Sequence, residues 1–216
     1  MTMPAASVLT FVRAALLVLL LALPTLAPSA DLPGGASRPS MAFGALGLLP
    51  GDSVYRLPVA LTDQDGRNFH LADRRGSLQL VSMFYTSCPY VCPLIIDTLK
   101  KTQHALTADE AARLQVLLVS FDPERDTATR LKEVFGQRKI DGASWTLART
   151  DTQSVRKLAA VLGVQYRKLA NREINHSTAI VLLNTDGRII ARTDKLGDVD
   201  ADFVAALRKA IAATGD

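Results

Sequence analysis

Two spacings of hydrophobic residues alternate along the chain from about residue 54 onward, and together they predict an α/β fold. Continuous apolar, β-rich runs over 78–85 and 114–121 indicate buried strands, and apolar residues at helical spacing follow each run. The elements expected in chain order are a hairpin over 59–71, a strand over 78–85, a helix over 93–106, a strand over 114–121, a helix over 127–138, a strand over 145–148, a helix over 151–163, a hairpin over 178–192 and a helix around 203–211.

Turn signals and the order of these elements narrow the fold further. Gln64-Asp65-Gly66 and Asp186-Gly187 stand between strand patterns and predict the two hairpins. Strands and helices alternate between them, which predicts a mixed central sheet with flanking helices and an N-terminal β-hairpin. A cysteine pair ends the strand before the first long helix, as in thioredoxin. We therefore expect a thioredoxin-like fold.

The N-terminal segment has the composition of an export signal. Residues 1–30 carry one basic residue and no acid, and an apolar run over 14–23 ends at Pro24. This layout predicts a secretory signal peptide, with an uncleaved membrane anchor as the alternative. Residues 31–53 are rich in Gly, Pro and Ala and are expected to form a flexible linker before a domain over 54–216. That domain is expected in the periplasm or on the outer face of the cytoplasmic membrane.

Charge and cysteine content exclude some functions and favour others. The net charge of +4 is small and spread along the chain, so we expect no nucleic-acid partner. The chain has only two cysteines, yet it is long enough to bury a core without a disulfide. A close pair of cysteines in such a domain therefore points to chemistry, although a structural disulfide or two buried thiols is the alternative.

The cysteine spacing favours a shared metal ion. Cβ atoms four residues apart on a helix lie about 5–6 Å apart, whereas a disulfide requires roughly 3.5–4.5 Å. A disulfide stays possible if the backbone adjusts. Pro93 is expected to be the first helical residue, which puts Cys92 at the helix start and Cys88 on the loop before it. The positive end of the helix dipole stabilises thiolates there.

A histidine supplies a candidate third ligand. His176 precedes the last buried strand pattern, and in a thioredoxin-like sheet the loop entering that strand faces the cysteine loop. Two thiolates and one imidazole suit copper, either Cu(I) or Cu(II), with Cu(I) favoured by thiolate. The alternative is a surface or packing histidine. His104 lies in a polar part of the first helix and is expected to be solvated, whereas the role of His70, at a hairpin end, stays open.

Four stretches of the chain resemble a known family. They are 66–71 (GRNFHL), 85–93 (YTSCPYVCP), 122–127 (DPERDT) and 175–177 (NHS). The chain resembles the Sco/SenC proteins, copper proteins linked to assembly of the cytochrome c oxidase copper centre, over about residues 57–211. The resemblance implies a thioredoxin fold, copper bound by Cys88, Cys92 and His176, and a domain held outside the cytoplasmic membrane.

This chain departs from the family pattern around the cysteines. Tyr90 stands where many members carry Asp, hydrophobic residues follow Pro93 where acids are frequent, and Asn175 precedes the histidine in place of an acid. The ligand set is unchanged, but its surroundings are less acidic than is usual, so partner docking and Cu(II) affinity are expected to differ.

Two acidic residues near the predicted site have competing interpretations. Asp122 ends the second core strand at the sheet edge that carries the cysteine loop. It either orients a ligand or partner, or only shapes a turn with Pro123. Asp126 or Thr127 is expected to cap the following helix, and capping is the favoured interpretation of Asp126.

The first functional hypothesis is a copper metallochaperone for a membrane-associated cuproenzyme such as cytochrome c oxidase. Other copper chaperones or thioredoxin-like reductants are further expected partners. The alternative is a thiol–disulfide reductase that reduces the cysteines of a copper-protein client, and a reversible Cys88–Cys92 disulfide that competes with copper fits both. A thiol peroxidase is disfavoured, because Tyr85 and Pro89 stand where such enzymes usually carry Thr. A purely structural domain is the fourth hypothesis.

Overall fold

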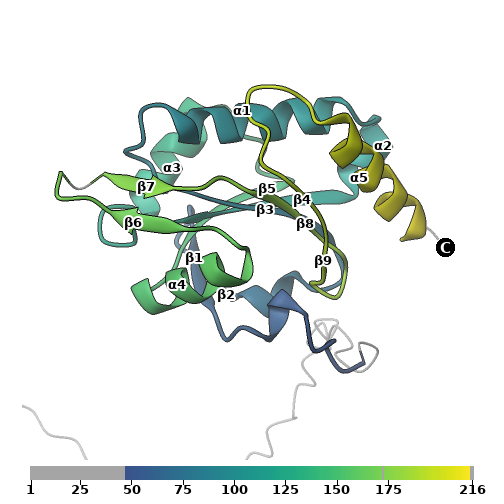
Figure 1. Ribbon diagram of the computed structural model, residues 1–216, viewed down its shortest axis with the longest axis horizontal. Helices are drawn as coiled ribbons and strands as arrows, with labels where there is room; N and C mark the ends of the chain where they lie inside the picture. Colours follow the sequence, from purple (N-terminus) through teal and green to yellow (C-terminus); the bar gives the residue numbers. More distant parts are fainter. Residues whose placement is uncertain (1–46, 172, 215–216) are drawn as a thin grey trace, which may run out of the picture. The chain divides into compact units, whose positions relative to one another are not determined.

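A seven-stranded sheet in the order β2-β1-β5-β4-β3-β8-β9 forms the centre of the protein (Figure 1). The computed structural model describes residues 47–171 and 173–214. The strands of the central sheet are β1 Ala60–Asp63, β2 Asn68–His70, β3 Leu78–Phe84, β4 Leu114–Ser120, β5 Trp145–Arg149, β8 Ile180–Leu183 and β9 Ile189–Thr193. Two further strands, β6 Tyr166–Lys168 and β7 Ile174–His176, pair only with each other and are called the β6–β7 ribbon below.

Parallel and antiparallel pairs are combined in the central sheet. β3 pairs in parallel with β4, and β4 with β5, whereas β8, β9, β1 and β2 join antiparallel. The predicted mixed sheet and N-terminal hairpin are therefore confirmed, and the fold is thioredoxin-like α/β.

Helices cover both faces of the sheet (Figure 1). α1, α3 and α5 lie on one face and α4 on the other. Hydrogen bonds join the helices of the first face: Lys100 of α1 donates to the Arg138 carbonyl beyond α3, and Arg208 of α5 donates to the Ala105 carbonyl. The helices are α1 Val91–His104, α2 Ala108–Ala112, α3 Ala128–Gln137, α4 Thr152–Val161 and α5 Ala201–Ala213, with short 3₁₀ turns η1 Val54–Arg56 and η2 Leu71–Arg74.

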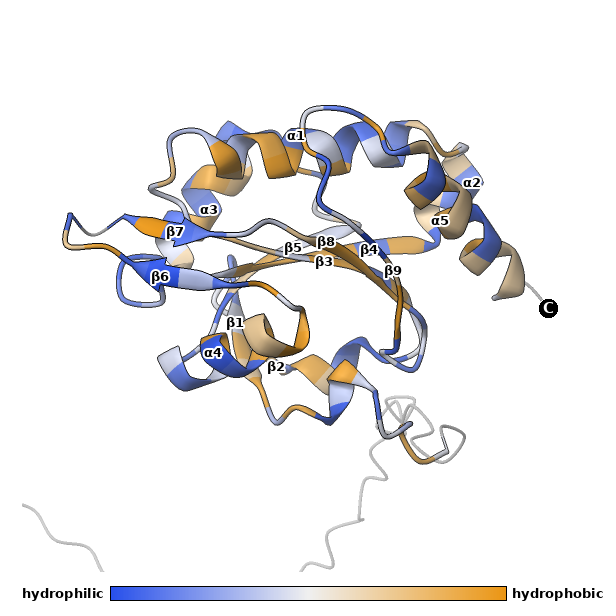
Figure 2. Ribbon diagram, viewed as in Figure 1, coloured by the Kyte–Doolittle hydropathy of each residue, from blue (hydrophilic) through white to orange (hydrophobic). Residues whose placement is uncertain are grey.

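The central strands are buried on both sides, because helices pack on each face. Every residue of β3 and β8 is buried, as is all of β4 except Gln115. Figure 2 shows these strands coloured mainly as hydrophobic, whereas hydrophobic and hydrophilic residues alternate along the helices on either side. The loops that follow β3 and β4 thus begin from a well-packed base.

Side chains at the helix starts explain where α3 and α4 begin. The Thr127 hydroxyl accepts the N–H of Arg130 at 3.2 Å and caps α3. The Asp151 carboxylate accepts two N–H groups at 2.9 Å and caps α4, as the sequence predicted. Asp126 does not cap α3, so that expectation was wrong. Its carboxylate lies in the interior, as described below.

Two local features differ from the sequence expectation. Helix α1 begins at Val91, so Pro93 lies third in the helix and not first. Proline is tolerated there, because the first turn of a helix has no intrahelical partner for its N–H groups. The β6–β7 ribbon was not predicted, and His176 ends β7 and does not begin the strand β8. Strands of three residues are too short to give a period.

The predicted leader over 1–30 lies outside the described residues, as does most of the predicted linker over 31–53. In the part of the chain that the structure describes, no helix has the length and apolar character needed to cross a membrane.

Candidate metal centre

Cys88 and Cys92 stand at the junction between β3 and α1, and both are free thiols. Cys88 lies on the loop and is half-buried, whereas Cys92 lies in the first turn of α1 and is only 3% exposed. The N–H of Cys92 points at the Cys88 sulfur at 3.4 Å, and the N–H of Tyr85 points at the Cys92 sulfur at 3.3 Å. Each sulfur therefore has a backbone donor.

The Cys88 thiol is tuned toward its thiolate form. Burial acts to raise the pKa of Cys88, but hydrogen bonds from the N–H groups of Cys92, Tyr90 and Val91 and from the Cys92 thiol outweigh it. The net pKa of Cys88 lies below its usual value. Because the thiolate is both the nucleophile and the metal ligand, Cys88 is the reactive member of the pair.

Cys92 is tuned in the opposite direction. Burial raises the pKa of the Cys92 thiol far above its usual value, and the negative charges of Cys88 and Asp126 act in the same direction. Without a bound cation, Cys92 therefore stays protonated at neutral pH. A metal cation beside it would supply the positive charge that its thiolate lacks.

A buried carboxylate holds the start of the cysteine loop. Asp126 is 0% exposed, and its oxygens accept hydrogen bonds from the Thr86 N–H at 3.0 Å, the Thr86 hydroxyl at 2.5 Å and the Ser120 hydroxyl at 2.5 Å. Thr86 is two residues before Cys88, and Ser120 is the last residue of β4. Asp126 therefore pins the cysteine loop to the neighbouring core strand.

His176 lies on the other side of the site, at the end of the β6–β7 ribbon. Its ring packs against Phe121, with 4.8 Å between ring centroids, and lies edge-on to Tyr85 at 6.0 Å. The Nδ1 atom is 3.0 Å from the Ser177 carbonyl oxygen. A carbonyl can only accept, so Nδ1 carries the proton and Nε2 keeps a lone pair. Burial lowers the pKa of His176, which favours the neutral imidazole that metals require.

The three predicted ligands are near one another but are not drawn into a cluster. Across 47–171 and 173–214, no three His, Cys, Asp or Glu side chains are already gathered closely enough to hold a metal ion. Tyr85 stands between the two sides: its backbone N–H donates to the Cys92 sulfur, and its ring lies edge-on to that of His176. A site made of Cys88, Cys92 and His176 therefore requires the histidine side to move toward the cysteines.

An ion-pair group holds the β6–β7 ribbon beside the loop after β4. The ammonium group of Lys168 in β6 lies 3.8 Å from the buried carboxylate of Asp122 and 3.3 Å from the exposed carboxylate of Glu124. Asp122 is also paired with Arg125, and its carbonyl closes a turn with the N–H groups of Arg125 and Asp126. Asp122 thus shapes the turn and also faces the ribbon that carries His176.

The other two histidines lie away from the cysteines. His70 is on β2, four strand positions from β3 in the sheet order, or about 19 Å at ~4.8 Å per strand. His104 is the last residue of α1 and is exposed, twelve residues beyond Cys92, or about 18 Å along the helix axis. His70 is therefore no candidate ligand, and His104 is solvated as expected.

Comparison with known proteins places this geometry in a family. The family model described as SCO1/SenC matches residues 51–212. The chain belongs to the SCO1/SenC family. The predicted family membership is therefore confirmed.

Individual SCO1/SenC-like relatives are distant in sequence. A candidate copper-binding protein of Stutzerimonas stutzeri is 25% identical over 162 residues, covering 70% of this chain and 78% of the relative. The crystal structure of a candidate electron transfer protein from Aquifex aeolicus VF5 matches this chain with a TM-score of 0.64 and 28% sequence identity. The match covers 77% of this chain and 94% of the Aquifex chain. Copper-bound ScoI of Bradyrhizobium japonicum has a TM-score of 0.61 at 24% identity, over 71% of this chain and 98% of that one, a likeness of fold.

Hydrophobic residues border the cysteines in this SCO1/SenC chain. Tyr90, between the two cysteines, is 78% exposed, and Leu94 on α1 is also exposed. A narrow cleft of about 80 Å³ reaches both sulfurs between α1 and α3. The cleft therefore admits small groups only.

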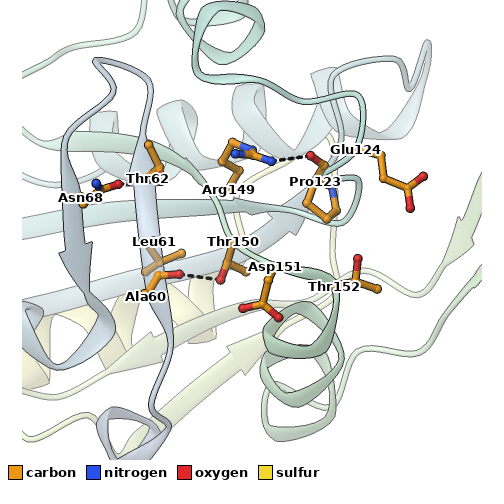
Figure 3. A pocket seen from close by; sticks show the side chains of 10 residues that line it. All are labelled: Ala60, Leu61, Thr62, Asn68, Pro123, Glu124, Arg149, Thr150, Asp151 and Thr152. Carbon is orange, nitrogen blue, oxygen red and sulfur yellow. Dashed lines mark hydrogen bonds between the residues drawn. The ribbon is translucent and has the colours of Figure 1, made fainter.

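A wider pocket of about 650 Å³ lies elsewhere, between β1, β5 and the start of α4 (Figure 3). Its side chains are joined to nearby backbone: Arg149 donates to the Pro123 carbonyl at 2.7 Å and Thr150 to the Ala60 carbonyl at 2.6 Å. No cysteine or histidine lines it. Of these two pockets, only the cysteine cleft is lined by residues whose side chains could bind a soft metal ion.

Two residues of the site were not anticipated from the sequence. Both stand in the stretches that resemble the family, but Asp126 was given a capping role, and Tyr85 was weighed by itself only as the residue in place of a peroxidase Thr. Their roles depend on partners about 40 and 89 residues away, Thr86 and Ile174, so no local pattern signals them. An acid directly before a better N-cap, Thr127, is the one available hint.

Proposed function

We propose that this chain is a copper metallochaperone that binds one copper ion through Cys88, Cys92 and His176. It would deliver the ion to a membrane-associated cuproenzyme, for which the family resemblance points to the copper centre of cytochrome c oxidase. One observation carries the proposal: the two cysteines line one cleft at the start of α1, and Tyr85 lies between Cys92 and the ring of His176, whose Nδ1 is held by the Ser177 carbonyl. Membership of the SCO1/SenC family and the copper named for two of its relatives support it.

The donor set fits copper, because soft thiolates and imidazole are the side chains that copper prefers. Copper is the cargo here, and the protein's contribution is to present ligands in sequence. Cys88 offers a thiolate that is half-exposed, so the ion meets it first. Cys92 loses its proton as the cation approaches, and His176 completes the set by turning its Nε2 toward the sulfurs.

Release follows the same asymmetry. Cys92 is buried beneath the loop, so an acceptor protein reaches the ion from the Cys88 side. The exposed ring of Tyr90 beside Cys88 gives that acceptor an apolar contact. We infer that a ligand of the client replaces Cys88 on the copper ion first, and that the bond to Cys92 breaks afterwards.

The test is copper stoichiometry of the full-length protein, purified in detergent and reduced. We expect one tightly bound Cu(I) per chain, lost in Cys88→Ser and in Cys92→Ser, because one thiolate and one imidazole leave an incomplete soft site. His176→Ala should weaken Cu(II) more than Cu(I), and His104→Ala is the matched control. Tight binding that persists in both cysteine variants would refute the proposed ligand set.

A thiol–disulfide reductase is the second candidate, and the same pKa difference favours it. A client disulfide would be attacked by the Cys88 thiolate, giving a mixed disulfide and a client thiolate that takes a proton. Cys92 would then lose its proton and attack Cys88, forming the Cys88–Cys92 disulfide and releasing the second client thiol. Two electrons pass to the client, and a thioredoxin-like reductant must return them.

Copper and redox chemistry can be separated with His176. His176→Ala should impair copper binding and leave reduction of a small disulfide at its wild-type rate. The copper proposal also predicts that complete oxidation of Cys88 and Cys92 abolishes Cu(I) binding. Unchanged Cu(I) binding after oxidation, verified by thiol counting, would contradict a shared site.

Export of the chain is part of this proposal. The composition of residues 1–30 supports a leader or anchor, and that of residues 31–53 a linker to the domain over 54–216. Fractionation of cells that express the full chain tests it, with recovery in the cytoplasm as the contrary result.

A further inference from the structure

The walls of the cysteine cleft carry positive side chains. Arg130 of α3 and Arg138, the C-cap of the same helix, line the cleft together with the two cysteines. No carboxylate of the described residues lines it. Asp126 lies behind the cysteine loop, fully buried and already occupied by three hydrogen bonds. The space that reaches the sulfurs therefore favours an anionic group.

The two arginines differ in how far they are already paired. Arg130 forms an ion pair with Glu133 at 2.7 Å, and because both side chains are about half exposed, this pair is weak. Arg138 is half-buried and makes no ion pair or side-chain hydrogen bond within residues 47–171 and 173–214. Its backbone carbonyl accepts the ammonium group of Lys100 at 2.5 Å, which adds a third positive charge nearby. The Arg138 guanidinium group can therefore take an incoming carboxylate through two parallel hydrogen bonds.

The size of the cleft limits what can enter it. Its volume of about 80 Å³ is far below the roughly 300–1,000 Å³ of a pocket that encloses a drug-sized ligand. Only the sulfur-bearing end of a small molecule fits beside the cysteines, so a carboxylate on the same molecule would stay at the rim with the arginines. Pro93 and Ile96 add an apolar wall for the short carbon chain between the two groups.

We propose that Arg130 and Arg138 make the cysteine cleft selective for small disulfides and thiols that carry a carboxylate group. The inference rests on the thiol–disulfide reaction given above as the second candidate function. The charge selection itself is a property of the reduced, copper-free protein, and it names the class of small molecule with which the two cysteines exchange electrons.

The exchange runs in two steps. The Cys88 thiolate attacks one sulfur of the small disulfide, whose S–S bond breaks, and the first carboxylate-bearing thiolate leaves and takes a proton. Cys92 then gives up its proton and attacks Cys88, which releases the second thiol and leaves the Cys88–Cys92 disulfide. Two electrons pass from the protein to the small disulfide. Two molecules of the same thiol reverse the steps and restore both cysteines.

The first test compares an anionic and a neutral alkylating reagent of nearly the same size. Cys88 of the reduced, copper-free, full-length protein is alkylated with iodoacetate and with iodoacetamide, and the ratio of the two rates is taken at one pH. The thiolate fraction cancels in this ratio, so the ratio reports the charge around the sulfur. Arg138→Gln should lower it about threefold, as expected for one unit charge removed from a few ångström away in a water-like medium. Arg130→Gln should lower it less, because Glu133 already pairs with that arginine.

Arg156→Gln is the matched control for this ratio. It removes the same charge from the exposed surface of α4, on the other face of the sheet, and should leave the ratio at its wild-type value. High salt should bring the ratios of wild type and Arg138→Gln together, because it screens the guanidinium charge. An unchanged ratio in Arg138→Gln would overturn the proposal, as would an equal fall in Arg156→Gln.

The second test uses three small disulfides that differ in charge: dithiodipropionate, an anion, hydroxyethyl disulfide, which is neutral, and cystamine, a cation. The variant that combines Arg130→Gln with Arg138→Gln should reduce the anion about fivefold more slowly than wild type, the neutral disulfide at an unchanged rate and the cation faster. Equal losses for all three would show that the arginines only support the loop, contrary to the proposal. If the wild type reduces none of them, the thiol–disulfide function fails, and the iodoacetate ratio still decides the charge selection.

Discussion

The cysteine loop and the β6–β7 ribbon approach the same site, but they are built in different ways. The loop leaves a strand that is buried along its whole length, and the interior carboxylate of Asp126 fixes it to β4. The ribbon pairs only with itself and rests on the Phe121 ring and an exposed Lys168. One side of the site is part of the core, and the other is attached to its surface.

The difference indicates which side moves when a metal ion is bound or released. Moving the cysteine loop would break a saturated buried network, whereas moving the ribbon changes ring contacts, one hydrogen bond of 3.4 Å from the Ile174 N–H to the Tyr85 hydroxyl, and exposed ion pairs. We therefore expect the backbone at Cys88 and Cys92 to stay fixed when a metal ion binds, while His176 moves toward the cysteines. The predictions below test this contrast, from the largest expected effect to the smallest.

Asp126→Ala should be the most damaging change. It leaves the Thr86 N–H and two hydroxyl groups without their acceptor, one of them, that of Ser120, in the interior, and should lower the free energy of unfolding by about 2–4 kcal/mol. Urea unfolding measures the loss, with Asp97→Ala on the exposed face of α1 as control. A loss below that of the control would show that the loop is not anchored as described.

Alkylation should separate the two cysteines by a large factor. In reduced, copper-free protein at neutral pH, Cys88 should react with iodoacetamide at least about 100-fold faster than Cys92, because its pKa is lowered and that of Cys92 is raised by burial. Because the pKa of Cys88 is lowered, its thiolate persists to a lower pH than that of an ordinary thiol. The alkylation rate at Cys88 should therefore fall only when the pH drops below the usual pKa range of a thiol. Peptide mapping over time supplies the rates.

His176→Ala is the control for that experiment. The cysteine loop is fixed from its own side, so the rates at Cys88 and Cys92 should stay within about twofold of wild type, well inside the tenfold of one pKa unit. A large change would mean that the ribbon sets the reactivity of the loop, contrary to the contrast drawn above.

Phe121→Leu should loosen the ribbon selectively. The ring of Phe121 packs on both Tyr166 and His176, so its loss should cost about 1–2 kcal/mol and speed amide exchange in β6 and β7. The Thr86 amide, held by Asp126, should exchange as in wild type after correction for global stability. Phe203→Leu removes a similar buried ring from α5, away from the ribbon. It should not speed amide exchange selectively in β6 and β7. If Phe121→Leu sped exchange of the Thr86 amide as much as that of the ribbon amides, the cysteine loop and the ribbon would not differ in how firmly they are held.

Lys168→Met should have the smallest effect. Its ammonium group is exposed and salt screens it, so the loss should be at most about 1 kcal/mol and should shrink as ionic strength rises. Thermal unfolding at low and high salt measures it against Arg167→Met, a neighbour on the same strand that forms no ion pair within residues 47–171 and 173–214. A larger, salt-independent loss would make the ribbon part of the core.

The same contrast explains which features the sequence predicts. The strands β3 and β4, the caps Thr127 and Asp151, and the hairpin at Asp186-Gly187 follow from periodic or adjacent residues. Cys88, Cys92 and His176 were selected by residue type and position. The strands of the ribbon have three residues each and are too short to show a period. The roles of Asp126 and Tyr85 arise from tertiary contacts. No local sequence pattern therefore predicts the ribbon or these two roles.

Helix α1 begins without a side-chain cap from its N-cap residue, Tyr90, and Pro93 in its first turn has no N–H. The Cys88 sulfur takes that place, since the N–H groups at the helix start converge on it. The Cys88 thiolate therefore caps the helix in place of a side chain from Tyr90, and oxidation to a disulfide would remove its negative charge. The first turn of α1 should fray when Cys88 is oxidised, and amide exchange at Cys92, compared between reduced and oxidised protein, would report the oxidation state of the site as a change in helix length.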